Sequence, residues 1–379
     1  KAQALFRIQR ARQFPTVNAG ATGDAYRIPR DMTSNDKAYT YETMQIGVQV
    51  SSWEADLFGR IRSLKQQALE QYLATEQGRI STQLALVSEV ATAYLALGAD
   101  RDNLRLAQAT LDAQKATYDL VRQTRDKGLK SDLEVSQSQS QVEAAQVDVV
   151  RFTGLLTLDE NALTLLVGAP VPESLLPREL GPAEALKEVA AGLPSGVLLR
   201  RPDIVSAEHQ LKAAYANIAA ARAAFFPTIV LTGGGGITSS ALSQLFSPRA
   251  LTWQFAPQIT VPIFDSGIRK TNYQVAELDR DAAVAQYEQA IQVAFREVSD
   301  ALSQRGRLLE QQSAQQALVN TLGETYRLTE ARYKAGVDNY LSVLVAQRSL
   351  YAAQQAMVGI RLSRLGNLVI LYKVLGGGA

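Results

Sequence analysis

The chain lacks cysteine altogether and has a single histidine, His209. The first absence excludes disulfides, thiolate metal sites and cysteine nucleophiles. Basic and acidic residues are nearly equal in number, 39 against 37, whereas nucleic-acid-binding proteins usually carry a basic excess. His209 is interpreted as a packed or surface residue rather than a ligand. Since no catalytic constellation is visible, we expect no enzyme, no metal, no cofactor and no nucleic-acid partner.

The sequence also lacks an unbroken run of 18 apolar residues and a visible signal peptide. The missing apolar run predicts that no helix of the chain spans a membrane. The chain begins in mid-pattern, because Pro15 corresponds to Pro227 but lacks the upstream helix start that Pro202-Asp203 provides in the second half. We therefore expect that the natural N-terminus is missing, together with any targeting or lipid-attachment segment.

What the chain does contain is a repeat with a constant shift of 208 residues. The recurring pairs include Tyr118 and Tyr326, Gly128 and Gly336, Leu133 and Leu341, and Gln139 and Gln347. One inserted residue would rotate every later side chain of a helix by about 100°. A gapless repeat therefore predicts long helices that keep their faces in register, and two copies of one elongated unit.

We predict three parts along the chain. Residues 1–167 form an N-terminally incomplete first repeat, 168–202 a proline-rich connector with a short helix near 183–191, and 203–379 the second repeat. Each repeat holds two strands, a very long helix, a tight turn and a return helix. The expected ranges are 15–57, 59–126 and 131–166 in the first repeat, and 227–264, 267–335 and 339–372 in the second. A helix of about 65 residues spans roughly 100 Å, a length that suits coiled coils and helical barrels.

The predicted strands alternate between apolar and polar residues, as in Met44, Ile46, Val48 and Val50 and again in Trp253, Phe255, Ile259 and Val261. Period two with one apolar face indicates a two-sided strand. Four such strands cannot close a barrel, and an open sheet would leave its edges unpaired. Two chains would give eight strands with a filled interior, and three would give twelve strands with an open polar lumen.

Aromatic residues gather at or near the predicted strand ends, as in the belts at membrane interfaces. They are Tyr26, Tyr39, Tyr41, Trp53, Trp253, Phe255 and Phe264. The alternative is the core of a β-sandwich, to which the adjoining long helices are hard to attach.

The polar run 136–141 favours a helix with one face on a neighbour and one in water. A hollow helical tube supplies both faces, and a solvent-exposed coiled coil is the alternative.

Several segments resemble the outer membrane efflux channels, the TolC-like family, and its OprM-type members in particular. They are Arg200–Ile204, Ala219–Arg222, Phe225–Pro227, Trp53–Gly59, Pro262–Phe264, Arg332–Tyr340 and Leu371–Gly378. The resemblance implies a mixed fold, in which a homotrimer closes a twelve-stranded membrane β-barrel that continues as a twelve-helix α-helical barrel in the periplasm.

The resemblance also implies a passive outer membrane exit duct of a tripartite multidrug efflux system. Its partners would be a periplasmic adaptor (membrane fusion) protein, an inner membrane RND-type transporter, outer membrane lipid and small-molecule drugs as cargo. The alternative is an envelope-spanning coiled-coil scaffold or a periplasmic adaptor without channel activity.

In this family the helix turns at the periplasmic end close the channel. The resemblance places the gate at Asp132, Glu134, Tyr333, Asp338, Ser342 and Val345. It places the adaptor contacts at Gly128, Leu129, Lys130, Ser131, Gly336, Val337 and Asn339. A contact between Glu134 and Tyr333 would latch the turns, and three copies would surround the axis with carboxylates, which favour cations.

Two features of the gate stay open at the level of sequence. Asp132 and Asp338 sit where an Asp, Ser or Asn cap starts the next helix, so they have a purely structural alternative. Relatives often carry aspartate nine residues after the second turn glycine, where this chain has Val345. That difference predicts an apolar constriction instead of an inner acidic ring.

Overall fold

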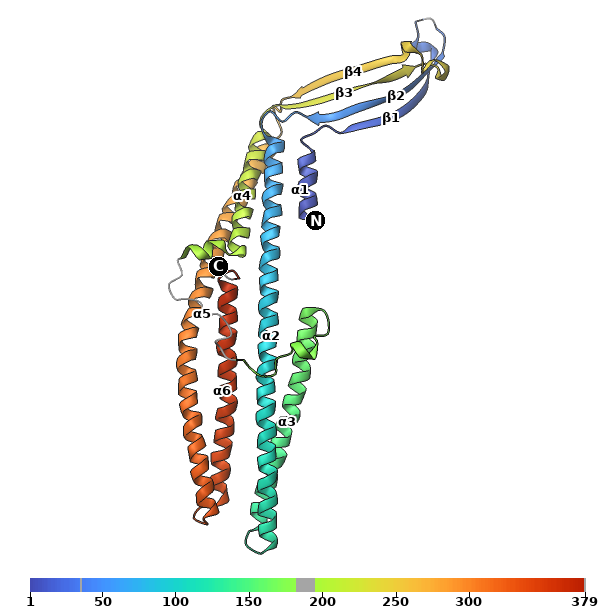
Figure 1. The fold of residues 1–379 in the computed structure, drawn as a ribbon. Coiled ribbons are helices and arrows are strands. Elements are labelled where there is room, and N and C mark those ends of the chain that lie inside the picture. Colours follow the sequence, from blue (N-terminus) through green and yellow to red (C-terminus); the bar gives the residue numbers. More distant parts are fainter. Residues whose placement is uncertain (35, 182–194, 378–379) are drawn as a thin grey trace. The chain divides into compact units, whose positions relative to one another are not determined.

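The computed structural model of the chain describes residues 1–34, 36–181 and 195–377, and Figure 1 shows how its elements follow one another. The helices are α1 (Ala2–Ala11), α2 (Arg60–Asp126), α3 (Asp132–Val167), α4 (Pro202–Ala223), α5 (Ile268–Lys334) and α6 (Tyr340–Val374). The strands are β1 (Val17–Ile28), β2 (Tyr39–Glu54), β3 (Thr228–Ser239) and β4 (Leu251–Thr260). Each half thus has two strands, a helix of 67 residues and a shorter helix. The short helix expected near 183–191 lies outside the described residues.

The chain divides into two compact units that cut across the sequence halves. One unit comprises Lys1–Gly78 with Asp203–Ala290, and the other comprises Arg79–Pro202 with Ile291–Ala379. The first unit contains the sheet, α1, α4 and the beginnings of the two long helices, and the second contains α3, α6 and the rest of the long helices. Strands of both halves pair with each other, so neither half is a compact body. The division into two repeats remains an interpretation of the sequence.

The sheet of the first unit is antiparallel, in the order β1-β2-β3-β4. β1 and β2 stay paired from Val17 and Val50 as far as Ile28 and Tyr39. Ser52 has a φ of 54° at an irregularity in the pairing of β2 with β3. Within the described chain, the outer edges of β1 and β4 have no partner strand.

The glycine run 233–236 lies within β3 and permits a close approach of two backbones there. A Cβ atom on Gly236 would collide with the carbonyl oxygen of Ile46 and with Gly47. Gly47 is the residue that pairs with Gly236 across the two strands. Glycine is therefore required here by space rather than by a left-handed conformation.

Helix α2 bears on the expectation that no helix of the chain spans a membrane. It contains an 18-residue window with a mean hydropathy of 1.3, of which 11% is buried, and is the one helix of the described part that is long and apolar enough to cross a membrane. Polar residues interrupt every apolar run in this part of α2, but they are few enough to leave the mean hydropathy of the window high. Length and composition alone make α2 a candidate, and a long helix that packs against neighbours meets the same test.

The core of the second unit joins the C-terminal helix to the connector. Leu371 and Leu365 on α6 pack with Leu180 of the connector and Ala99 of α2. Arg201, which is 7% exposed, donates hydrogen bonds to Glu297 Oε2 at 2.7 Å and to the Val374 carbonyl oxygen at 3.0 Å. Arg201, at the end of the connector, thereby holds α5 and the end of α6 together within the second unit.

We predict that Arg201→Ala destabilises the second unit by about 3 kcal/mol, because it leaves the Glu297 carboxylate and a buried carbonyl group unpaired. The measurement is the thermal unfolding of the purified protein in detergent, followed by circular dichroism. The exposed neighbour Arg200 supplies the control, since Arg200→Ala should leave the midpoint almost unchanged. Equal shifts for the two variants would contradict the role given to Arg201.

Candidate functional site

Two helix turns lie at corresponding places in the repeat, one between α2 and α3 and the other between α5 and α6. Gly128 and Gly336 end the long helices with φ values of 78° and 74°, a left-handed conformation that glycine adopts without strain. Ser131 caps α3, because its Oγ accepts a hydrogen bond from the Glu134 amide. Asn339 caps α6 in the same way through the Ser342 amide, at 3.1 Å.

The two aspartates considered as caps have other partners. Asp338 accepts hydrogen bonds from Arg332 Nε at 2.6 Å and Arg332 Nη2 at 3.0 Å, and these bonds lower its pKa. Asp132 is largely exposed and has Arg125 Nε at 3.6 Å from its Oδ1. The structural alternative is therefore wrong for both residues, since Ser131 and Asn339 act as the caps. The arginines also offset the negative charge that a ring of these carboxylates would carry.

Lys130 connects the two turns. Its Nζ lies 3.1 Å from Glu134 Oε1 and 4.1 Å from the centroid of the Tyr333 ring, where it makes a cation–π contact. Burial pushes the pKa of Glu134 upward, but hydrogen bonds from the Ser131 amide and Lys130 outweigh burial and lower it. Glu134 thus stays ionised at neutral pH. The link expected directly between Glu134 and Tyr333 runs through Lys130 instead.

Tyr340 is a residue of this site that sequence reasoning did not single out. It is 2% exposed and packs with Val343 and Leu344, while Tyr326 and Tyr333 cover this cluster. The Tyr340 and Tyr333 rings lie 5.3 Å apart. Burial raises the pKa of Tyr340 to about 12. The repeat contains a signal for this position, because the residue 208 positions earlier is the exposed Asp132.

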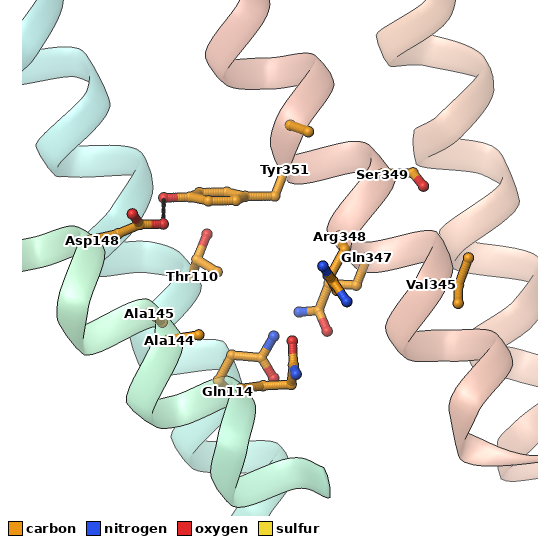
Figure 2. A pocket seen from close by; sticks show the side chains of 12 residues that line it. Thr110, Gln114, Ala144, Ala145, Asp148, Val345, Gln347, Arg348, Ser349 and Tyr351 are labelled. Carbon is orange, nitrogen blue, oxygen red and sulfur yellow. Dashed lines mark hydrogen bonds between the residues drawn. The ribbon is translucent and has the colours of Figure 1, made fainter.

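A groove of about 510 Å³ lies in the second unit and is lined by α2, α3 and α6. Figure 2 shows Tyr351 of α6 reaching across it, and its hydroxyl donates to Asp148 Oδ2 on α3 at 3.0 Å. Gln114 lies in the wall of the groove and is 4% exposed. Val345 also lines the groove and is 57% exposed. An apolar side chain is thus presented at the position where the sequence predicts a constriction.

The predicted interface aromatics occupy several kinds of place on the sheet. Tyr26 and Tyr41 are neighbours on β1 and β2, with ring centroids 5.1 Å apart. Trp253 and Phe255 are exposed on β4, at 79% and 62%, and Phe255 lies near the middle of the strand rather than at its end. Trp53 is half-buried at the end of β2. Tyr39 and Phe264 are exposed as well.

His209 is a packed residue, in agreement with its interpretation from the sequence. Its Nδ1 lies 2.6 Å from Glu70 Oε2, and the Glu70 side chain is 10% exposed. Among the described residues, no group of three histidine, aspartate or glutamate side chains is placed to hold a metal ion.

The long helices, the two linked turns and the four-stranded sheet together recur in known proteins. The family model described as "Outer membrane efflux protein" matches residues 1–169 and 193–377. This chain belongs to the outer membrane efflux protein family. It is accordingly a protein of the bacterial outer membrane that extends into the periplasm, and the family consists of efflux proteins rather than enzymes.

Similar members of the outer membrane efflux protein family come from several bacteria. The probable efflux pump outer membrane protein TtgC of Pseudomonas putida is 47% identical over 99% of this chain and 78% of its own length. The outer membrane protein OprJ of Pseudomonas aeruginosa is 41% identical over 100% of this chain and 79% of its own. The open state of the MtrE outer membrane channel of Neisseria gonorrhoeae superposes with a TM-score of 0.88 at 37% identity, covering 100% of this chain and 84% of that one.

Proposed function

We propose that three copies of the chain form a passive exit duct, in which twelve strands close a membrane barrel and twelve helices continue it as a periplasmic tunnel. The observation that carries this proposal is the open sheet, whose edge strands β1 and β4 lack partners within the described chain. Antiparallel pairing of β1 with β4 of the next copy would satisfy both edges. Each sequence repeat would then contribute two strands and two helices to the ring. Three copies favour an open lumen, which eight strands would not leave.

The partners of the duct are inferred from its family. One relative is described as a toluene efflux pump outer membrane protein and another as an antibiotic efflux pump outer membrane protein. By analogy, the duct would carry small-molecule drugs delivered by an inner membrane RND-type transporter. A periplasmic adaptor protein would contact the helix turns at Gly128–Ser131 and Gly336–Asn339. The exposure of Leu129 and Val337, 72% and 62%, supports this contact.

Gating is assigned to the same turns. Lys130 ties Glu134 of one turn to Tyr333 of the other, while Arg332 holds Asp338 beside the cap formed by Asn339 and Ser342. Asp132 and Val345 would face the narrowed opening. Adaptor binding would separate the turns and widen the passage, after which cargo diffuses through the water-filled tunnel.

The proposed function is tested by the assembly and conductance of the purified protein. A detergent extract should contain trimers, and these should insert into planar lipid bilayers and conduct ions. A water-soluble monomer without conductance would refute the duct and favour a scaffold or adaptor instead.

Removing the Lys130 link should open the turns. We expect both the double variant Glu134→Gln with Tyr333→Leu and the single variant Lys130→Met to raise single-channel conductance severalfold. In the first the lysine loses its ionised partner, and in the second the cation itself is removed. The neighbouring turn residue Lys127 provides the control Lys127→Met, for which we expect wild-type conductance. If all these variants conduct like the wild type, the link is only structural.

The apolar side chain at Val345 should set the ion preference of the constriction. Val345→Asp would add three carboxylates around the axis of a trimer, and a ring of acid attracts cations. Reversal potentials measured across a salt gradient should therefore shift toward the cation equilibrium potential. Val345→Asn tests polarity without charge and should leave the selectivity unchanged. An unaltered reversal potential in Val345→Asp would show that this residue does not line the constriction.

A further inference from the structure

The first unit contains a pocket that neither the gate nor the lumen explains. It has a volume of about 270 Å³ and is formed by α1, the end of β2 and the start of α2. Gln9, Arg12 and Phe14 line it from the N-terminal side, and Trp53, Glu54 and Arg60 line it from the other. All these residues belong to one compact unit.

Two buried nitrogen atoms in the wall of this pocket have no acceptor. The Trp53 indole Nε1 and the Gln9 amide Nε2 are shielded from water, and neither has a hydrogen-bond partner among the described residues. Both groups are donors only. A buried donor that stays unpaired costs about 1–3 kcal/mol, so a ligand whose acceptor atoms reached these two nitrogens as the side chains turned toward it would relieve both costs.

The charges around the pocket favour a ligand that is also negative. The one carboxylate in the lining, Glu54, is held by Arg60, whose Nε donates to Glu54 Oε1 at 2.8 Å and whose Nη2 donates to Glu54 Oε2. This pair leaves little net charge. Arg12 is exposed, makes no ion pair within the described residues and adds one positive charge to the lining of the pocket. A guanidinium group matches the geometry of a phosphate.

The second half of the chain shows that this combination is not part of the common scaffold. When Pro15 is aligned with Pro227, the residues that match Gln9 and Arg12 are Ala221 and Ala224. The glycines that precede the two long helices also correspond, since Gly59 and Gly267 differ by 208 positions and have φ values of 81° and 87°. That alignment replaces Trp53 and Glu54 with Val261 and Pro262. The donors and the cation therefore occur in the first copy alone.

We propose that this pocket binds the phosphodiester group of a glycerophospholipid. At about 30 Å³ per water molecule, the pocket has room for a phosphate and part of the glycerol but not for acyl chains. These chains would lie along the exposed Phe14 and Val17, which are 67% and 64% accessible. The assignment rests on the proposed function, because a sheet that spans the outer membrane places its helix-bearing end at the periplasmic lipid interface.

Trp53 allows binding to be measured directly. The chain has two tryptophans, so Trp253→Phe leaves Trp53 as the only tryptophan in each copy of the chain. Titration with monomeric dihexanoylphosphatidylglycerol in a non-ionic detergent should change its emission with a saturable dependence on lipid. Adding Arg12→Gln should raise the apparent Kd about tenfold, and Gln9→Leu should raise it severalfold. Arg10→Gln is the matched control, because Arg10 is exposed on the same helix and does not line the pocket.

Three results would overturn the assignment. One is an emission change that does not saturate, and another is an equal effect of Arg12→Gln and Arg10→Gln. The third is saturation by inorganic phosphate at the same or lower concentrations, which would identify a site for free anions. The same samples are examined for trimers and for conductance. Conducting trimers that fail to bind the lipid would sink this inference alone, whereas failure to form a conducting trimer would count against the proposed function.

Discussion

The structure depends on the backbone groups along the free edges of β1 and β4. An edge strand presents a row of N–H and C=O groups that water can satisfy but hydrocarbon cannot. The sheet also exposes Trp253 and Phe255 on a strand of the single chain, so an isolated copy would be poorly suited both to water and to lipid. The proposed closure with other copies would remove both difficulties. The tight approach of β2 to β3 at Gly47 and Gly236 suits a sheet that has to curve.

The proposed closure of the sheet would constrain the helices that leave it. Each long helix has 67 residues, and a one-residue slip would turn its far end by about 100°. Lys130 meets Tyr333 only if α2 and α5 keep their register over that distance. This requirement accounts for the constant shift of 208 residues between the two copies. The turns are thus placed by the length and phase of the helices, and their own chemistry needs to supply only the final contacts.

Sequence reasoning could predict those features that depend on local rules. Alternation located the strands, and Gly128 and Gly336 located the turns because a helix often ends in a left-handed glycine. The choice of Ser131 over Asp132 as the cap could not be made, since both residue types cap helices and they are adjacent. The Lys130 contact could not be foreseen either, because it joins residues about two hundred positions apart. The buried indole nitrogen of Trp53 is likewise visible only in the folded structure, where α1 and the end of β2 line one pocket.

The places where the two halves differ are therefore the most informative ones. Ser131 and Asn339 occupy equivalent positions, and each caps the N-terminus of the helix that follows it. One residue before them, Lys130 corresponds to Asp338, and the opposite charges engage Glu134 and Arg332 respectively. One residue after them, the exposed Asp132 corresponds to the buried Tyr340. A duplicated scaffold keeps what geometry demands in both copies. Some interactions are needed only once in each chain, such as the contact that joins the turns or the proposed phosphate site beside Arg12. At those positions the residues of the two copies have to differ.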